Sequence, residues 1–185
     1  MKVIRTNIAE VVFLEPSVFC DRRGHFFESF SRREFERLVG RVDFVQENES
    51  SSIYGVLRGM HFQREPHAQA KLVRVVRGKI LDVAVDIRVG SPTFGEHALC
   101  EISSDNRRQI FIPRGFAHGF AVLSEEATVV YKCDNYYAPE SAGTIAWNDP
   151  VLNINWGIDE AQAILSENDR SAPPLKEITD LPEYR

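Results

Sequence analysis

Cysteine is scarce in this chain. The three cysteines, Cys20, Cys100 and Cys133, are odd in number and far apart, and no two of them have the spacing of metal ligands. We therefore expect reduced thiols, as is usual in the cytosol.

Long apolar runs are missing as well. No run approaches the ~20 residues that a membrane-spanning helix requires. Residues 1–5 lack the apolar region of a secretory signal, and the short apolar run at 11–14 is broken by Glu15 and Pro16. We expect a cytoplasmic protein with no membrane partner.

An excess of positive charge is also absent, since 22 Lys and Arg stand against 27 Asp and Glu, a formal net charge of −5. A nucleic-acid-binding protein would carry a basic field, so that class is disfavoured. An anionic small ligand is still compatible, because a local cluster of arginines can act inside a pocket. The 185 residues suit a single domain, 1–185, with its core at about 3–169 and a tail at 170–185 that wraps a surface.

Short strands and turns dominate the chain from residue 42 onward. Between 71 and 87, on both sides of a turn at Gly78, residues alternate with the period of two that is typical of strands. This pattern predicts an all-β sandwich or barrel. Further strands are expected at 109–112, 118–123 and 127–132, at 25–30, and as a pair within 3–19 that turns near Glu15 and Pro16.

One short helix is predicted at 31–40. Ser31 and Glu34 match a capping box, apolar residues follow at helical spacing, and Gly40 stands at the C-terminal end. Residues 158–165 favour one or two helical turns.

The stretch 55–63 places an arginine and a histidine among glycines and apolar residues. A guanidinium fits phosphate oxygens, and an imidazole accepts a proton near neutral pH. In a regular strand Arg58 and His61 would point to opposite faces, so both can reach one ligand only if Gly59 bends the chain. The alternative is an edge strand with an exposed Arg58 and a hydrogen-bonded His61.

A second stretch, 112–120, has a Pro-x-Gly-x-x-His spacing that resembles the second motif of the cupin superfamily of jelly-roll barrels, with His118 as its histidine. The first cupin motif fits as far as His61, but Gln63 stands where the next metal-binding histidine would be. Glutamine is a poor ligand for transition metals, and a metal site usually needs three protein ligands. We therefore expect the barrel without a metal, which disfavours a metal-dependent oxygenase of the cupin type.

Many short motifs between about residue 3 and Asp169 resemble, in order and without large gaps, the dTDP-4-dehydrorhamnose 3,5-epimerase family. They lie at 21–24, 27–30, 45–48, 57–63, 70–73, 82–86, 91–95, 113–120, 131–132 and 147–150. The resemblance implies an all-β, cupin-type jelly-roll fold and a cofactor-independent isomerase. Its reaction would invert C3 and C5 of dTDP-4-dehydro-6-deoxy-D-glucose to give dTDP-4-dehydro-L-rhamnose.

The resemblance also implies four catalytic residues. His61 matches the base that removes a proton next to the ketone, and Asp169 matches the carboxylate that orients its imidazole. Lys71 matches the cation beside the enolate oxygen, and Tyr131 the acid on the opposite face of the sugar. Strand parity separates Tyr131 from Lys132, so only Tyr131 should enter the barrel.

A further set of residues matches the family's substrate contacts. Arg58 matches a phosphate contact and His118 a ligand contact nearby, with Lys71 also in the binding set. The residues matching the nucleotide-binding set are Arg23, Glu28, Gln46, Glu47 and Asn48. In the family the neighbouring subunit supplies part of this set, which implies a homodimer that binds a dTDP-linked 4-keto-6-deoxyhexose at a shared nucleotide site.

The chain departs from the family at the ligand-binding end. Asn168 stands where Lys is common, and Ala142 where Glu is common, with Glu140 close by. The nearest alternative is a relative that inverts only one of the two carbons, and a further one is a non-catalytic sugar-nucleotide-binding protein. Asp82 and Asp86 share a strand face and are expected to be structural or solvent-facing.

Overall fold

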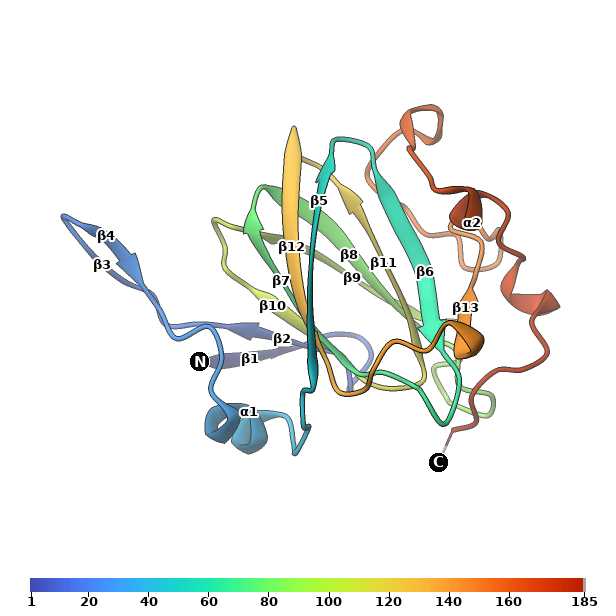
Figure 1. The fold of residues 1–185 in the computed structure, drawn as a ribbon, viewed down its shortest axis with the longest axis horizontal. Helices are drawn as coiled ribbons and strands as arrows, with labels where there is room; N and C mark the ends of the chain where they lie inside the picture. The colour runs from blue at the N-terminus through green and yellow to red at the C-terminus, as the bar shows by residue number, and fades with distance from the viewer. Residues whose placement is uncertain (185) are drawn as a thin grey trace.

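Two antiparallel sheets packed face to face form the body of the computed structural model, which describes residues 1–184 (Figure 1). The six-stranded sheet has the order β1 (Lys2–Arg5), β2 (Val12–Glu15), β10 (Gln109–Ile112), β7 (Lys71–Arg77), β12 (Glu126–Cys133) and β5 (Gln46–Ile53). The five-stranded sheet has the order β13 (Ala142–Thr144), β6 (Leu57–Gln63), β11 (Phe116–Val122), β8 (Lys79–Asp86) and β9 (His97–Ser103). The predicted all-β class is confirmed.

Three kinds of smaller feature complete the described chain. A ribbon of β3 (Phe19–Asp21) and β4 (Gly24–Phe26) projects from the body (Figure 1). The helices are α1 (Arg32–Leu38) and α2 (Glu167–Arg170), and the 3₁₀ turns are η1 (Pro139–Ser141), η2 (Glu160–Gln162) and η3 (Leu175–Glu177).

The alternation in the sequence explains how the five-stranded sheet buries both of its faces. In β8, Ile80 and Ala84 point into the core between the sheets, whereas Val83 and Val85 point to the outer side of the five-stranded sheet. All four are fully buried. Because successive residues of a strand face opposite ways, such a strand is apolar on both faces only when both faces are covered.

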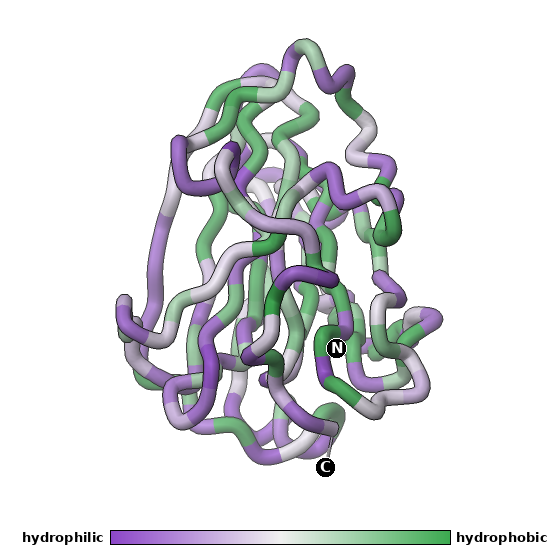
Figure 2. Tube along the Cα trace, turned by 90° about the vertical axis from the view of Figure 1, so that its right-hand side faces the viewer, coloured by the Kyte–Doolittle hydropathy of each residue, from purple (hydrophilic) through white to green (hydrophobic). Residues whose placement is uncertain are grey.

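The C-terminal part of the chain covers the outer face of the five-stranded sheet. Trp147, Trp156 and Leu175 pack there against Leu57 and Val83 in one buried cluster. Figure 2 views the molecule from this side and shows apolar stretches running along the strands beneath. Leu175, Ile178 and Leu181 of the tail pack in this cluster, and α2, which comes just before the tail, contacts β6.

The single predicted helix at 31–40 is confirmed as α1, with Ser31 at its N-cap. The Ser31 side chain makes no capping hydrogen bond, so the capping box is present in sequence but not in contacts. Phe35 anchors the helix by packing edge-on against Phe44 and Phe111. The predicted helical turn at 158–165 is the short 3₁₀ turn η2.

Two predicted strand boundaries are wrong. The first two strands turn at residues 6–11, where the Thr6 hydroxyl donates to the carbonyl oxygens of Ile8 and Val11, and Pro16 follows the end of β2. The strand expected at 25–30 ends at Phe26, because β3, its only partner, begins at Phe19 opposite that residue. The residues after it leave the ribbon and lead into α1.

Candidate active site

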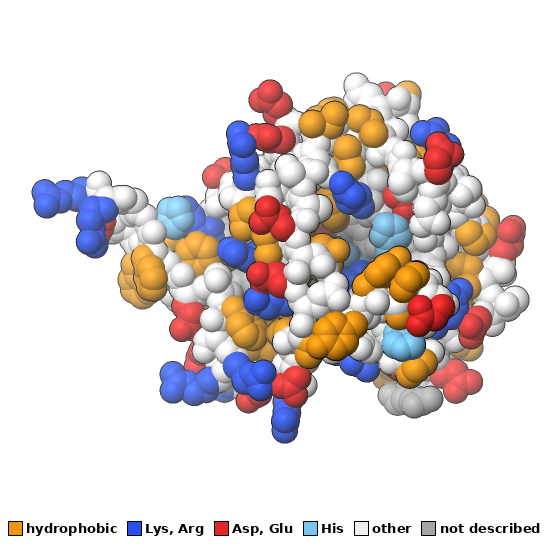
Figure 3. Space-filling view, in the orientation of Figure 1, with side chains coloured by type: hydrophobic (Ala, Val, Ile, Leu, Met, Phe, Trp, Pro, Cys, Tyr) orange, Lys and Arg blue, Asp and Glu red, His pale blue; other side chains and the backbone are white. Residues whose placement is uncertain are grey.

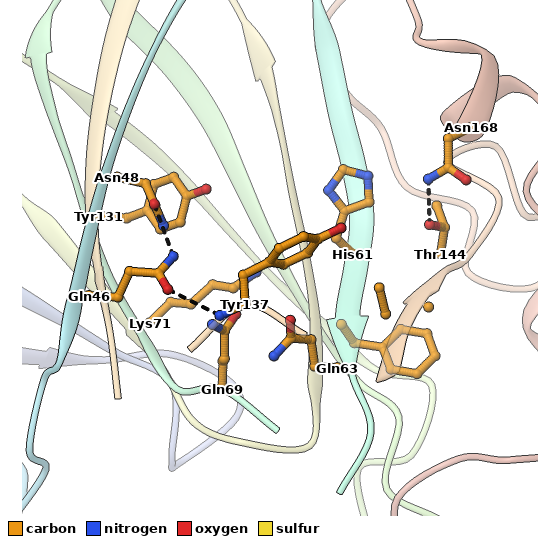
Figure 4. Close-up of a pocket in the computed structure, with 13 residues that line it drawn as sticks. Gln46, Asn48, His61, Gln63, Gln69, Lys71, Tyr131, Tyr137, Thr144 and Asn168 are labelled. Carbon is orange, nitrogen blue, oxygen red and sulfur yellow. Dashed lines mark hydrogen bonds between the residues drawn. The ribbon is translucent and has the colours of Figure 1, made fainter. Parts of the chain in front are cut away.

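A cavity of about 350 Å³ opens between the two sheets beside α2 (Figure 4). Its lining comes from both sheets and from the covering segment: Gln46, Asn48, His61, Phe62, Gln63, Gln69, Lys71, Tyr131, Tyr137, Ala142, Gly143, Thr144 and Asn168. Figure 3 shows the hollow near the middle of this face, with histidine and basic side chains visible in it. The volume suits a small organic ligand.

The bend expected at Gly59 is present in β6. Leu57 and Met60, three positions apart, both enter the cluster on the outer side of the sheet, which a regular strand would not allow. Gly59 has a φ of 142°, and a Cβ there would lie 2.5 Å from the Cα of Gly119 on β11. The break in alternation leaves His61 on the cavity side.

His61 meets its predicted partner across a long stretch of sequence. Its Nε2 lies 2.5 Å from Oδ1 of Asp169, a residue of α2 that is 3% exposed. Asp169 is held in turn by Ser166, whose hydroxyl donates to Oδ2 at 2.8 Å. Although burial acts to raise the pKa of Asp169, the hydrogen bonds from His61 and Ser166 keep it below its ordinary value. An ionised carboxylate can only accept, so Nε2 carries the hydrogen and Nδ1 keeps its lone pair.

Lys71 and Tyr131 line the same cavity from neighbouring strands, β7 and β12. Burial lowers the pKa of Lys71, while the nearby Cys133 and Asp82 act in the opposite direction. Burial raises the pKa of Tyr131, so the phenol keeps its proton at neutral pH. The parity prediction is confirmed: Tyr131 packs against the core between the sheets, whereas Lys132 forms an ion pair with Glu47 and lies over the ring of Phe30 outside it.

His118 lies on β11 directly opposite His61 and forms a pair of its own. Its Nε2 lies 2.9 Å from Oδ2 of Asp82, and both side chains are almost completely buried. Burial lowers the pKa of His118, and the charges of Lys71 and His61 lower it further, although Asp82 opposes them. The structural reading of Asp82 and Asp86 holds for Asp86, which binds Arg88, Ser91 and Thr93.

The position of Asp82 beside the site was not predicted from the sequence. Its carboxylate lies in the interior between the sheets, next to His118 and close enough to act on Lys71. One signal was available, because Asp82 stands between the apolar Ile80 and Ala84 on the inward face of its strand. Gln69, Tyr137 and Thr144 were missed as lining residues too, since they lie in connections or at a short strand whose course the sequence did not reveal.

The structure separates the predicted nucleotide-binding residues into two groups. Gln46 and Asn48 face the cavity from β5 and are hydrogen-bonded to each other at 3.0 Å. Glu47, between them, points to the opposite face of the sheet. Arg23 is exposed on the projecting ribbon, where it pairs with Asp21, and the exposed Glu28 follows that ribbon, so neither reaches the cavity of its own chain.

Arg58 lies on β6, next to Ser52 of β5. Its side chain is exposed, and its Nε donates to the hydroxyl of Ser52 at 3.1 Å. It does not line the cavity, but its charge acts on Tyr131. The two unusual residues of the sequence are both in the lining: Asn168 donates to the hydroxyl of Thr144 at 2.9 Å, and Ala142 stands two positions before Thr144.

Among residues 1–184, no group of three or more His, Cys, Asp or Glu side chains is arranged to hold a metal ion. In the same part of the chain, no helix has the length and apolar character needed to cross a membrane.

Fold and cavity together define the class of protein. A cupin-type jelly roll holds an imidazole–carboxylate pair, an ammonium group and a protonated phenol around one small cavity. These are the groups that proton transfer next to a carbonyl requires. The arrangement is the one expected of an isomerase of the epimerase type.

Comparison with known proteins identifies the family. The family model for dTDP-4-dehydrorhamnose 3,5-epimerase matches residues 5–177. The dTDP-4-dehydrorhamnose 3,5-epimerase of Salmonella typhimurium is 53% identical over 176 residues, which cover 95% of this chain and 96% of the relative. The chain belongs to the dTDP-4-dehydrorhamnose 3,5-epimerase family.

Solved structures agree with this membership. The dTDP-6-deoxy-D-glucose-3,5-epimerase of Legionella pneumophila, in complex with dTDP-4-keto-L-rhamnose, is 48% identical with a TM-score of 0.96, covering 100% of this chain and 98% of that one. A 3′-monoepimerase of Streptomyces bikiniensis in complex with dTDP-quinovose is 34% identical with a TM-score of 0.91, covering 97% and 92%. The oxygenase and the non-catalytic binding protein are therefore set aside as classes.

Proposed function

We propose that this chain inverts C3 and C5 of dTDP-4-dehydro-6-deoxy-D-glucose, giving dTDP-4-dehydro-L-rhamnose, by removal and return of a proton at each carbon. The observation that carries the proposal is the convergence of His61, Lys71 and Tyr131 on one cavity. Family membership and the product bound to the Legionella relative support the same reaction. The proposed chemistry needs no cofactor.

His61 is the proposed base. With Nε2 held by Asp169, the lone pair on Nδ1 is the free basic position of the ring. Taking a proton makes an imidazolium ion, which the ionised Asp169 stabilises at 2.5 Å. The carboxylate therefore favours proton removal without itself touching the sugar.

Lys71 is the proposed cation beside the sugar ketone. Removing a proton next to a carbonyl places negative charge on the carbonyl oxygen, and a cation fixed there lowers the barrier. Lys71 is positioned by β7 and by the surrounding interior, and the carboxylate of Asp82 acts to keep its amino group protonated. Its side chain lines the cavity in which the ligand is proposed to bind.

Tyr131 is the proposed acid. Inversion requires that the returning proton arrive from the face opposite the base, and Tyr131 approaches the cavity from the six-stranded sheet while His61 belongs to the five-stranded sheet. Its raised pKa keeps the proton in place until the strongly basic enolate forms. Figure 4 shows the two rings on different sides of the cavity.

The remaining predicted residues are proposed to bind the dTDP group. Arg58 and His118 serve the phosphates and the adjacent sugar, and Gln46 and Asn48 the nucleoside, with Glu47 beside them. Arg23 and Glu28 would act on the site of a second subunit in a homodimer. The projecting ribbon supports this arrangement because it exposes Phe19 and Phe26, the latter at 72%. We also propose that the protein is located in the cytoplasm.

Incubation of the substrate in D₂O tests the assignment of base and acid. Wild-type protein should place deuterium at both carbons that flank the ketone, and His61→Ala should lose this exchange. Tyr131→Phe should slow epimerisation by roughly 10²- to 10⁴-fold while keeping exchange at the carbon facing the base. His97→Ala and Tyr184→Phe are matched controls, since neither residue lines the cavity, and full turnover by both site variants would refute the roles.

A second candidate is inversion of a single carbon. It is favoured by the likeness to the Streptomyces 3′-monoepimerase and by the unusual lining residues Ala142 and Asn168. The product's NMR spectrum separates the two, because the proposed reaction gives two inverted centres and the alternative gives one.

A further inference from the structure

The segment 135–138 forms one rim of the cavity. It joins the end of β12 to η1 and presents two tyrosines, Tyr136 and Tyr137, each 64% exposed. Tyr137 lines the cavity, and Figure 4 shows its ring reaching across toward the side where His61 lies. The position of this ring therefore sets the shape of the space in which a ligand sits.

Three glutamine side chains hold the backbone of this segment. Gln69 donates to the carbonyl oxygen of Asn135 at 2.8 Å, and Gln63 donates to that of Tyr136 at 3.1 Å. The amide N–H of Tyr137 donates to Gln46 Oε1 at 3.0 Å, and that of Ala138 donates to Gln63 Oε1 at 2.9 Å. These glutamines come from β5, β6 and the connection before β7, and all three line the cavity.

Gln63 is the centre of this arrangement. Its side chain is 7% exposed, and both ends of its amide are used, because Nε2 also donates to the carbonyl oxygen of His67 at 2.6 Å. Gln63 therefore links His67, in the connection after β6, to the residues on either side of Tyr137. An apolar side chain in its place would leave buried backbone groups without partners.

The chemistry of the amide explains why glutamine suits this position. Two carbonyl oxygens need donors and one N–H needs an acceptor, all from one side chain. A primary amide offers two donors and an acceptor within a single planar group, whereas a neutral imidazole offers one of each on opposite sides of a ring. The residue that stands where a cupin metal ligand would be is thus committed to the backbone.

We propose that Gln63 is a positioning residue that, together with Gln46 and Gln69, fixes Tyr137 at the mouth of the cavity and acts on ligand binding through that tyrosine. The kinetic part of this inference rests on the proposed epimerase function, but the positioning itself does not. Gln46 links the rim to the cavity floor, because its Nε2 donates to Asn48 at 3.0 Å. A shift of the segment 135–138 would therefore also displace Asn48, which is predicted to contact the nucleoside.

The test compares Gln63→Leu with Gln109→Leu. Gln109 is a matched control, because it is 2% exposed and donates to a backbone carbonyl, that of Ser29, at 2.5 Å on the outer side of the other sheet. In Gln63→Leu, hydrogen exchange at the amides of Tyr137 and Ala138 should accelerate at least about tenfold. In Gln109→Leu, exchange at these two amides should stay as in wild type.

A double-mutant cycle distinguishes positioning from general damage. Gln63→Leu should weaken binding of dTDP, used as the probe, by about tenfold and raise KM more than it lowers kcat. In a Tyr137→Ala background the same substitution should change dTDP affinity less than about twofold, because the residue through which it acts is gone. Equal losses in the two backgrounds would overturn the proposal.

A second variant covers the case in which Gln63→Leu does not fold. Gln69→Leu removes only the bond to Asn135 and should produce the same changes in a weaker form. A protein that binds dTDP but does not epimerise would defeat the proposed function and leave the cycle intact. If dTDP does not bind, amide hydrogen exchange alone tests the positioning role of Gln63. Unchanged exchange at Tyr137 and Ala138 in Gln63→Leu would then overturn the proposal.

Discussion

Asp82 accepts a hydrogen bond from Nε2 of His118 at 2.9 Å in the closed interior between the two sheets. Because a carboxylate has no hydrogen to give, the bond fixes the neutral imidazole with its hydrogen on Nε2 and its lone pair on Nδ1. The second carboxylate oxygen, Oδ1, has no hydrogen-bond partner among the described residues. Its charge acts instead on Lys71, whose pKa it raises against the larger effect of burial.

Replacing Asp82 by Asn should therefore change the pH dependence of the reaction. Without the negative charge, the pKa of Lys71 falls further, so the alkaline limb of kcat/KM should move to lower pH. Asp86→Asn is the matched control, since Asp86 is equally buried on the same strand but binds Arg88, Ser91 and Thr93. A pH profile of each variant measures the effect, and an unmoved limb in Asp82→Asn would contradict it.

Lys71 itself should set that alkaline limb. Only the ammonium form stabilises an enolate, and burial lowers the pKa of Lys71, so activity should be lost as pH rises through this lowered value. Tyr131 cannot set the limb, because burial raises the pKa of its phenol. Lys71→Arg should retain part of the activity and lose the limb up to the highest pH at which the protein is folded, since a guanidinium does not deprotonate.

The catalytic rate should be sensitive to changes in Asp169 and in the residues that hold its carboxylate beside His61. Asp169→Asn should reduce kcat by about 10²-fold or more with little effect on KM, because the imidazolium ion loses its partner. Ser166→Ala removes one hydrogen bond to Asp169 and should cause a smaller loss in the same direction. Ser171→Ala, at the other end of α2, serves as the control, because its hydroxyl bonds only the carbonyl of Glu167.

Asp169 should also contribute to acid stability. Its pKa is lower in the folded protein than its ordinary value, so the stabilisation is complete above that ordinary value and is lost as pH falls through the folded-state pKa. In Asp169→Asn, the free energy of unfolding should accordingly depend less on pH at the acidic end. Urea unfolding at a series of pH values measures this, and parallel curves for the two proteins would contradict it.

Gly59→Ala should be strongly destabilising. A methyl group there would lie 2.5 Å from the Cα of Gly119, and the φ of 142° is itself unfavourable for alanine. Gly40 is the matched control, because its φ is 135° but nothing lies within 4 Å of the point that a methyl group would occupy. We expect a loss of about 3 kcal/mol or more in the free energy of unfolding for Gly59→Ala and about 1 kcal/mol for Gly40→Ala. Equal losses would show that close packing against β11 is unimportant.

Local pattern predicted much of the fold, because alternation in β7 and β8 and the apolar spacing in α1 are properties of neighbouring residues. Local pattern failed to predict the structure where contacts between residues distant in sequence, or single side-chain hydrogen bonds, determine it. Phe27 to Phe30 read as a strand, yet β3 offers no partner beyond Phe26, and Phe30 instead packs against Phe35. The turn at residues 6–11 depends on the hydroxyl of Thr6, which carried no signal at the level of pattern.

The site could be predicted only in part for the same reason. Parity placed Tyr131 inside and Lys132 outside, and the glycine between Arg58 and His61 indicated the bend. The partner of His61 came from resemblance alone, since nothing local to Asp169 distinguishes it from a surface carboxylate. The hydrogen bonds of Gln63 could not be predicted, because their partners are backbone groups of His67, Tyr136 and Ala138, and a backbone group leaves no pattern in the sequence.

His61 and Asp169 are 108 positions apart, and the carboxylate arrives on the segment that wraps the barrel last in chain order. A ribosome therefore completes every strand of both sheets before it reaches the residue that gives the histidine its partner. Catalytic turnover therefore requires that the covering segment has been synthesised and has packed against the sheet, in addition to the folding of the two sheets.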